Sequence, residues 1–305
     1  IVTVIDKENG HYGSCINAAL PVAKGKYVKV LDADDWFDPQ GFQYLIDTLQ
    51  TLDNDMVITN YSERHVSGKR IYRYYSSSDR FDIRETPTSD TFVLPHHVAM
   101  QAVTYRTELL RRMNYRQSEG VHYSDGEWVL YPLFFVETWA FINADVYQYF
   151  LGRAEQSIAS GVFKKNMAQF QVVKLHMLEY YFTFNRESLS KSRDAYLFDE
   201  VSNPFLFIYR SYLLWHSEND FVPDKMSSFD NAIRKINEGF YNHLSKETLR
   251  RWLPVRYIQY WRTHSKRLPL WVRFPMKILL VLLNETNFFL PKRIEDIICL
   301  CKKRV

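Results

Sequence analysis

The chain has 305 residues, 46% of them hydrophobic and 24% charged, which is a globular composition with enough length for one large domain or two smaller ones. Its net charge of +4 is unevenly distributed. Residues 250–305 carry 13 Lys and Arg against 3 acidic residues, a net charge of +10, and residues 1–249 carry 26 against 32, a net charge of −6. The basic residues gather at one end without a known recognition motif, which argues against a nucleic-acid-binding protein.

The cysteines indicate a reducing, cytosolic setting. There are three, Cys15, Cys299 and Cys301, and the last two are too close together for an ordinary disulfide. Since that pair has no second pair of Cys or His, we expect no zinc site. Ile1 lies inside an apolar run without an initiator methionine, so we expect the chain to be a fragment of a longer polypeptide.

The first segments alternate between strand and helix patterns. The apolar, β-branched run 1–6 predicts a buried strand, and a Gly- and Asn-rich stretch leads to a predicted helix over 14–23. Residues 27–31 predict a second strand. Asp38 and Pro39 then have the residue types of an N-cap and a first helical position, and the apolar spacing after them predicts a helix.

The same alternation continues to about residue 155. Strands are predicted at 55–61 and 71–76, and residues 99–113 predict a strand followed by a helix with Thr107 as its cap. Residues 139–153 predict two short strands. Strands that alternate with helices indicate an α/β sheet covered by helices on both faces.

The remaining chain has helical spacing. Apolar residues three and four apart predict helices within 166–184, 203–216 and 229–244. We therefore expect a domain boundary near residue 160, with an α/β domain over 1–160 and a helical domain with a basic tail over 161–305.

Three aspartates, Asp32, Asp34 and Asp35, crowd together after the predicted strand 27–31. Ligands of open α/β sheets bind outside the carboxyl ends of the strands, and Mg²⁺ typically takes one or two carboxylates together with substrate phosphates. Trp36 and Phe37 exclude a calcium-binding EF-hand loop, and no phosphate-binding P-loop accompanies the acidic strand end. The alternative is a solvated turn whose aspartates cap the next helix.

The stretch ENGHYGSCINAALPVAKGKYVKVLDADDWFDPQG resembles the nucleotide-sugar-binding half of bacterial family 2 glycosyltransferases, which have the GT-A fold. The likeness consists of an Asn/Gly-rich loop, an asparagine on the following helix, an A-x-G-x-Y entry to a strand, and a D-x-D signature that continues as D-D-W. It extends over about residues 1–160. The resemblance implies a Rossmann-like mixed sheet with helices on both faces, followed by a helical C-terminal region, and it implies that the family's first strands are absent from this chain.

The resemblance also implies roles for individual residues. Asp34 would be the principal ligand of Mn²⁺ or Mg²⁺ on the donor diphosphate, Asp32 would lie near the metal or the ribose, and Asp35 would support the loop or contact the donor sugar. The implied donor-binding residues are Asn9, Gly10, Gly13, Asn17, Asp32, Asp35 and Arg153. Gly10 and Gly13 as mere turn residues remain an alternative.

A second acidic segment, VHYSDGEWVLYPLFF, puts a polar loop before a predicted helix. In similar transferases an aspartate at this place is the general base on the acceptor hydroxyl, which implies that role for Asp125, with Glu127 as the alternative. The family commonly has an acidic residue before this aspartate, where this chain has Ser124.

A third segment, YQYFLGRAEQS, is similar to the end of the family's catalytic domain. Its Arg153 would bind phosphate oxygens, because a guanidinium forms paired hydrogen bonds with them; a surface arginine that holds the domain edge is the alternative. His96 and His97 precede a predicted strand and could reach the site, although a pair of histidines without further signals is more often structural.

These observations predict an inverting, metal-dependent glycosyltransferase that moves a sugar from a nucleotide-sugar donor to a saccharide or lipid-linked acceptor in cell-surface polysaccharide synthesis. The alternative is an inactive carbohydrate- or nucleotide-sugar-binding scaffold with the same fold. We expect a cytoplasmic protein with peripheral contact to the inner face of the membrane through residues 266–305, where a buried helix with a solvated basic face is the competing interpretation.

Overall fold

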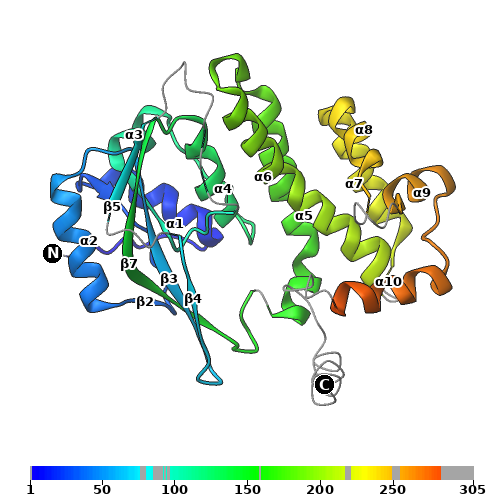
Figure 1. Cartoon of the computed structure of the whole chain (residues 1–305), viewed down its shortest axis with the longest axis horizontal. Helices are drawn as coiled ribbons and strands as arrows, with labels where there is room; N and C mark the ends of the chain where they lie inside the picture. The colour runs from blue at the N-terminus through cyan, green and yellow to red at the C-terminus, as the bar shows by residue number, and fades with distance from the viewer. Residues whose placement is uncertain are drawn as a thin grey trace. The chain divides into compact units, whose positions relative to one another are not determined.

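The computed structural model describes residues 2–75, 80–84, 92, 94, 97–157, 159–216, 221–248 and 255–282. His96, Cys299, Cys301 and the part of the predicted membrane-contacting tail after residue 282 lie outside these residues. The chain forms two compact units (Figure 1). Unit 1 comprises Ile1–Ala159 and Asn166–Glu200, and unit 2 comprises Ser160–Lys165 and Val201–Val305.

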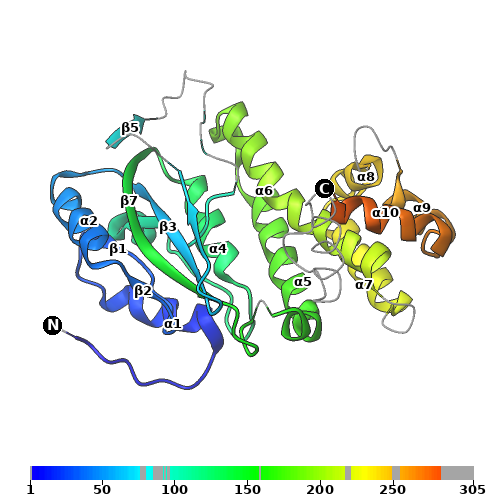
Figure 2. The ribbon, with the colours of Figure 1, turned by 60° about the horizontal axis from the view of Figure 1, so that its bottom comes forward.

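The described residues of unit 1 form one mixed sheet of seven strands. In chain order they are β1 (Tyr27–Val28), β2 (Trp36–Phe37), β3 (Met56–His65), β4 (Arg70–Arg73), β5 (Arg80–Arg84), β6 (Val103–Arg106) and β7 (Thr138–Leu151). The sheet has the order β1-β6-β3-β7-β2, with β4 beside β3 and β5 beside β7. Among the described strands, the central β3 and β7 are parallel to each other, and the other pairs are antiparallel. Figure 2 shows β3 beside β7.

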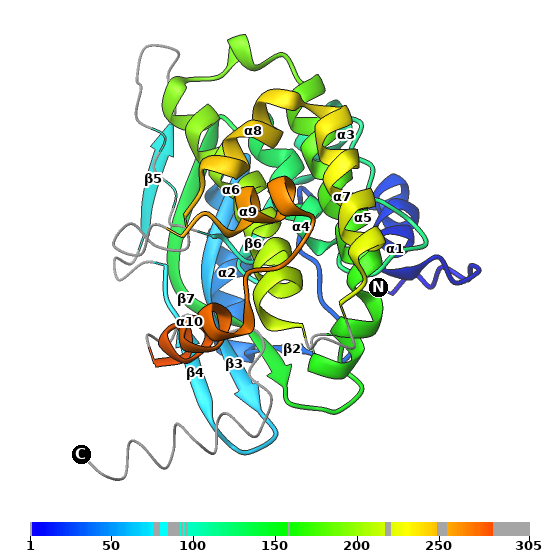
Figure 3. The same cartoon turned by 90° about the vertical axis from the view of Figure 1, so that its right-hand side faces the viewer.

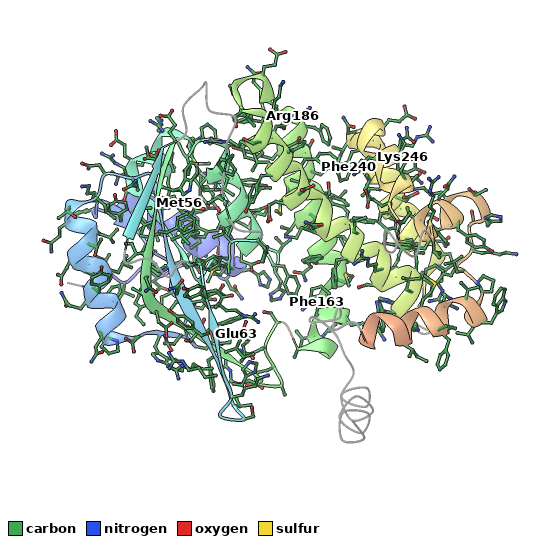
Figure 4. All side chains as sticks on the ribbon, in the orientation of Figure 1. Met56, Glu63, Phe163, Arg186, Phe240 and Lys246 are labelled. Carbon is green, nitrogen blue, oxygen red and sulfur yellow. The ribbon has the colours of Figure 1, made fainter. Side chains whose placement is uncertain are left out.

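The two central strands are buried on both faces. Val57 of β3 and Ala140 and Ile142 of β7 pack in one cluster with Leu45 and Leu52. The alternate side chains point to the opposite face, because successive residues of a strand face opposite sides. There the fully buried Trp139 packs against Phe92, with 5.1 Å between the ring centroids. Figure 4 labels Met56 near the start of β3 and Glu63 near its end.

Helices cover this sheet, which confirms the predicted fold class. They are α1 (His11–Ala19), α2 (Pro39–Thr51), α3 (Thr107–Arg112), α4 (Asp125–Leu130) and the parts of α5 (Ser160–Thr183) and α6 (Lys191–Arg210) that belong to unit 1. Helix α2 begins as predicted, with Pro39 in its first turn and Asp38 as N-cap accepting a hydrogen bond from the Gly41 amide at 2.9 Å. Figure 3 shows β3, β4, β5 and β7 side by side.

Two predicted strands differ from the structure near the N-terminus. Residues 2–6 form no strand, and Val2 and Val4 are 88% and 86% exposed, because none of the described strands pairs with them. The strand predicted at 27–31 is paired only at Tyr27–Val28, opposite β6. A β-branched, alternating run forms a strand only where a partner satisfies its backbone groups.

The start of α3 and the extent of β7 also differ from the boundaries predicted from the sequence. The predicted cap Thr107 is the first residue of α3, and its hydroxyl donates to the Gly25 carbonyl at 2.5 Å instead of capping the helix. The two short strands predicted at 139–153 are one strand, β7, which stays continuous because β3 pairs with it across an irregularity around Asn60.

The contacts place residues 166–200 with the sheet, whereas the division that we expected from the sequence falls near residue 160. Tyr180 stacks on Tyr131 with 4.1 Å between ring centroids, and Tyr196 packs on Phe92 at 5.3 Å. The Arg193 guanidinium donates to the Val136 carbonyl. These aromatic and polar contacts join the middle of the helical region to unit 1.

Unit 2 is helical, as predicted for the C-terminal region. Besides the remainder of α5 and α6 and a π-helical turn (Ser211–Trp215), it contains α7 (Pro223–Ile236), α8 (Glu238–Lys246), α9 (Tyr257–His264) and α10 (Leu270–Leu282). Arg262 of α9 pairs with the buried Asp230 of α7 at 2.7 Å, and Tyr209 also bonds to this pair. None of the described helices is both long and apolar enough to cross a bilayer.

Candidate functional site

The acidic turn lies between β1 and β2 and is attached to the carboxyl-terminal half of β7. The Tyr147 hydroxyl donates to Asp35 Oδ2 at 2.6 Å and accepts the Asp32 amide at 3.2 Å. The other oxygen of Asp35 accepts the Phe150 amide at 2.8 Å, and the residue is only 9% exposed. Asp35 therefore holds the turn against the sheet. The other two carboxylates of the cluster, Asp32 and Asp34, do not take part in these bonds.

Asp34 forms an ion pair with Arg153, which comes from the loop directly after β7. Gln156 shapes that loop: its side-chain oxygen accepts the Gly152 and Arg153 amides at 2.8 and 3.2 Å, and its amide group donates to the Phe150 carbonyl. Gly152 has a φ of 101°, a conformation that favours glycine. Among the described residues, the buried Nε of Arg153 has no hydrogen-bond partner.

Negative charge is concentrated around Asp32. Burial, with additional repulsion from Asp35, Asp125 and Asp34, raises the pKa of Asp32 to about 7. The repulsion from Asp125 indicates that the second acidic segment, which contains this residue, lies near the acidic turn. In the sequence, 93 residues separate Asp32 from Asp125. The acidic turn, Arg153 and Asp125 all belong to unit 1, and Asp125 is near enough to Asp32 to repel its charge.

Asp125 and Glu127 have different surroundings, although both lie in the first turn of α4. Asp125 is exposed, whereas Glu127 is fully buried. Glu127 accepts hydrogen bonds from the Ser118 amide and hydroxyl, both at 2.7 Å, and from the Tyr131 hydroxyl at 3.1 Å. A carboxylate engaged in this way is poorly placed to receive an acceptor's proton, so the geometry favours Asp125 as the base.

The predicted donor-binding residues on and before α1 contact the loop 117–120. The Asn17 side chain donates to the Gln117 carbonyl at 2.8 Å and accepts the Gln117 amide at 3.0 Å. A Cβ at Gly13 would lie 2.0 Å from the Ser118 carbonyl oxygen, so only glycine allows this approach. Gly10 accepts the Gly120 amide at 2.8 Å.

Asn9 accepts the His11 amide at 3.0 Å, where His11 has a positive φ of 60° at the start of α1. Together with the contacts of Gly10, Gly13 and Asn17, this bond forms the framework that leads from α1 to the loop before α4. Their role toward a nucleotide remains a prediction.

Several site residues were not predicted from the sequence. Tyr12, Tyr149 and Lys174 all interact electrostatically with Asp125. So does His97, for which both a place within reach of the site and a structural role were considered. His97, which has a φ of 57°, pairs with Glu200 of α6 at 3.6 Å. Tyr147 and Tyr149 alternate along β7, so the Y-x-Y pattern was a signal for them, but nothing in the sequence linked residues 174 and 200 to residue 125.

The residues present are compatible with a divalent cation. No cluster of three or more metal-ligating side chains occurs within the described parts of the chain. The two carboxylates predicted to hold a cation are Asp32 and Asp34 of the acidic turn. Mg²⁺ commonly has one or two carboxylate ligands and completes its shell with water and substrate phosphates. The pairing of Asp34 with Arg153 shows that this carboxylate already accepts a cationic partner.

The fold resembles that of known GT-A glycosyltransferases. Staphylococcus aureus TarS residues 1–349 in complex with UDP-GlcNAc has a TM-score of 0.53 and 13% identity, with 85% of this chain and 69% of that chain covered. The same TarS fragment in complex with UDP has a TM-score of 0.50 and 12% identity, with coverages of 82% and 66%. The chain thus spans about two thirds of these relatives. No curated protein matches the sequence.

The sheet topology and these similar structures define the class, a GT-A-type α/β fold. Residues 1–111 match the family described as Glycosyl transferase family 2. This match confirms, for residues 1–111, the resemblance to family 2 glycosyltransferases that the residues around Asp34 indicated.

Proposed function

We propose that this protein transfers a sugar from a nucleotide-diphosphate sugar to a hydroxyl group of a saccharide or lipid-linked acceptor, with inversion at the anomeric carbon. The single observation that carries the proposal is the acidic turn, which Asp35 holds on Tyr147 and Phe150 and whose Asp34 pairs with Arg153. A charged donor-binding turn and a separate exposed carboxylate are the two parts that such a transfer needs.

In the proposed reaction, Asp125 accepts the proton of the acceptor hydroxyl while the oxygen of that hydroxyl forms a bond to the anomeric carbon. The bond from this carbon to the diphosphate oxygen breaks on the opposite face, so the electron pair leaves with the nucleoside diphosphate. A proton-accepting carboxylate must lie within hydrogen-bond reach of the attacking oxygen. The exposed position of Asp125 fits this requirement better than the buried position of Glu127.

Asp34 and Asp32 would hold Mn²⁺ or Mg²⁺, which supplies charge neutralisation for the leaving diphosphate. Arg153 would exchange its partner Asp34 for a phosphate oxygen, and its unpaired Nε–H offers a further donor. Asp35, Asn9, Gly10, Gly13 and Asn17 would shape the donor pocket through the hydrogen bonds and close contacts described above.

The proposal is tested by combining calorimetry with a transfer assay. Because TarS was crystallised with UDP-GlcNAc, that donor and UDP-glucose are the first candidates, each with Mn²⁺, Mg²⁺ or EDTA. Metal-dependent binding together with sugar transfer or donor hydrolysis supports the enzyme. Binding without any turnover against a panel of saccharide and lipid-linked acceptors would favour the inactive scaffold instead.

We propose that the protein acts in cell-surface polysaccharide synthesis, at the inner face of the membrane. In α10 the apolar side chains of Leu270, Trp271, Phe274 and Ile278 are 47–78% exposed. They recur at helical spacing, and the exposed Lys266 precedes the helix, a combination that suits an anionic lipid surface. Co-sedimentation with phosphatidylglycerol vesicles should fall in a Trp271→Ser, Phe274→Ser variant; unchanged binding would remove this part of the proposal.

A further inference from the structure

Four strands contribute to one face of the sheet beyond the irregularity in the pairing of β3 with β7, where β4, β3 and β7 lie side by side (Figure 3). Tyr72 of β4 lies opposite Ser62 of β3, and Ser62 lies opposite Gln148 of β7. Gln148 in turn lies opposite Trp36 of β2. Because directly opposed residues point to the same side of a sheet, these four side chains form one row. Tyr147, which holds the acidic turn, precedes Gln148 and therefore points to the other side.

The middle of this row is a closed layer of polar side chains. Ser62 and Gln148 are fully buried. They donate to the two carboxylate oxygens of Asp145 at 2.8 and 3.1 Å, and Arg70 pairs with the same carboxylate at 2.5 Å. The Arg64 Nε donates to the Gln148 side-chain oxygen at 2.6 Å. These bonds satisfy the buried polar groups and fix the positions of two guanidinium groups.

Exposed aromatic rings lie at both ends of the row. Trp36, Tyr72 and Tyr74 are 43–55% exposed. At one end, 6.0 Å separates the ring centroids of Trp36 and Phe150, and at the other end 5.9 Å separates those of Tyr72 and Tyr74. The buried Asn60 amide donates to the Tyr72 hydroxyl at 3.0 Å, which fixes that ring. Since neighbouring strands are about 4.8 Å apart, the two ends are about 14 Å apart. Exposed apolar groups gathered in this way are typical of binding sites.

The same face carries excess positive charge. Asp145 offsets the charge of Arg70, whereas Arg64 contacts the neutral amide of Gln148. Lys69, between β3 and β4, is exposed. Among the described residues, no carboxylate pairs with Arg64 or Lys69. A guanidinium forms paired hydrogen bonds with a carboxylate or a phosphate, so the charge of this face complements an oxyanion.

We propose that this face binds an acidic saccharide chain. The apolar C–H side of a sugar ring packs on an aromatic ring, its hydroxyl groups bond to the polar side chains, and its carboxylate or phosphate pairs with Arg64. The face ends at Trp36, directly after Asp35, and so reaches the strand that follows the acidic turn. The bound chain is then the acceptor of the transfer, and this last step rests on the proposed function. The residues that define the face are Trp36, Arg64, Arg70, Tyr72 and Tyr74.

The experiment measures the binding of saccharides to the full chain by calorimetry at low ionic strength. Tetragalacturonate supplies carboxylates, a phosphomannan supplies phosphates, and maltotetraose is the neutral counterpart. Oligothymidylate tests whether a single-stranded nucleic acid, which also combines rings with oxyanions, binds instead. The variants are Arg64→Gln, Tyr72→Ala and Tyr72→Phe, the last of which keeps the ring. Tyr44→Ala and Arg112→Gln are the controls, because both residues are exposed on helices outside this face. Circular dichroism verifies folding.

We expect at least one acidic saccharide to bind more tightly than maltotetraose and oligothymidylate, with an affinity that falls as salt is added. Arg64→Gln should weaken this binding about tenfold, because a charged pair of hydrogen bonds is lost. Tyr72→Ala should weaken it about threefold to tenfold, whereas Tyr72→Phe and both controls should bind like the wild type. The saccharide that binds identifies the oxyanion. Absence of binding to both acidic saccharides, equal affinity for maltotetraose or oligothymidylate, or unchanged affinity in Arg64→Gln and Tyr72→Ala overturns the inference.

Failure of this inference and failure of the proposed function give different results. UDP should bind equally to Arg64→Gln and to the wild type, because Tyr147 holds the acidic turn on the other side of the sheet. Asp34→Asn, which removes the predicted metal ligand, should bind the acidic saccharide like the wild type. If the wild type binds the saccharide but neither binds nor turns over a nucleotide sugar, the proposed function fails and the saccharide-binding face stands.

Discussion

The hydroxyl group of Tyr147 donates to the Asp35 carboxylate at 2.6 Å, across 112 residues of sequence, and so fixes the acidic turn on β7. The same oxygen accepts the Asp32 amide. One side chain therefore sets the position of the turn and, through it, of Asp34.

Tyr147→Phe should remove both bonds and leave the largely buried Asp35 with one donor. We expect the free energy of unfolding to fall by about 1 to 3 kcal/mol, the cost of leaving a buried polar group unsatisfied. Urea unfolding followed by circular dichroism measures it, with Tyr44→Phe as a control because Tyr44 is exposed. Equal losses in the two variants would show that the Tyr147 hydroxyl has no special role.

Asp34→Asn should abolish the binding of Mn²⁺ in the presence of UDP, because a neutral amide is a much weaker ligand for a hard cation. The matched control is Asp38→Asn, since Asp38 caps α2 and belongs to the same acidic segment. Calorimetry should show normal metal binding in this control. Metal binding that survives in Asp34→Asn would exclude Asp34 as principal ligand.

Arg153→Gln should weaken donor binding about tenfold or more, since charged hydrogen bonds to phosphate contribute more than neutral ones. Its melting temperature should change little, because the pair with Asp34 is partly exposed and exposed ion pairs add little stability. Calorimetric titration with UDP measures the affinity, and Arg112→Gln is the exposed control. Unchanged affinity for UDP would show that Arg153 contributes to the loop after β7 and not to donor binding.

Gly13→Ala should destabilise unit 1 by about 2 to 4 kcal/mol, because the new methyl group would overlap the Ser118 carbonyl and force α1 away from the loop 117–120. Gly161→Ala is the counterpart at an open helical position, where no atom lies within 4 Å, and should be neutral or slightly stabilising. Thermal unfolding of both variants compares them. A Gly13→Ala protein that is as stable as the wild type would contradict the close approach of Gly13 to the Ser118 carbonyl group.

Lys29 predicts a pH dependence of stability. Burial lowers its pKa from 10.5 to about 7, while its amine donates to the Gln101 and Val103 carbonyls at 2.8 and 3.3 Å. Between these two pH values the unfolded chain binds a proton that the folded chain lacks, so the free energy of unfolding should rise with pH. The slope should be at most about 1.4 kcal/mol per pH unit and smaller in practice, since the residue is partly exposed.

Urea unfolding at pH 7.5, 8.5 and 9.0 measures this slope. Lys29→Met should flatten it relative to the wild type, whereas Lys24→Met, an exposed change in the same segment, should preserve it. Parallel curves for wild type and Lys29→Met would show that Lys29 stays charged in the folded protein.

Local signals predicted much of unit 1. Asp38 and Pro39 identified the start of α2, and the D-x-D residues identified the family, because caps and motifs depend on neighbours in sequence. The buried position of Glu127 and the contacts of Asn17 depend on the loop 117–120, which is distant from Asn17 in sequence, so their roles emerged only from the fold.

The errors have a common cause. The run 1–6 has the composition of a strand but no partner among the described strands, and β7 continues through a segment that was divided into two because pairing with β3 spans the irregularity. Lys174 and Glu200 lie in segments with ordinary helical spacing, where no pattern distinguishes a residue that faces a site from one that packs between helices.

The irregular pairing of β3 with β7 has a consequence for how the site can vary. Thr59 pairs with Ile142 but Tyr61 pairs with Tyr147, so β7 has extra residues between these two pairs. The part of β7 that follows them is displaced along β3. Removing one of them would exchange the faces of Tyr147 and Gln148, turning the phenol away from Asp35. Related sequences should therefore tolerate insertions in the loops around the sheet far better than a single deletion between residues 143 and 146.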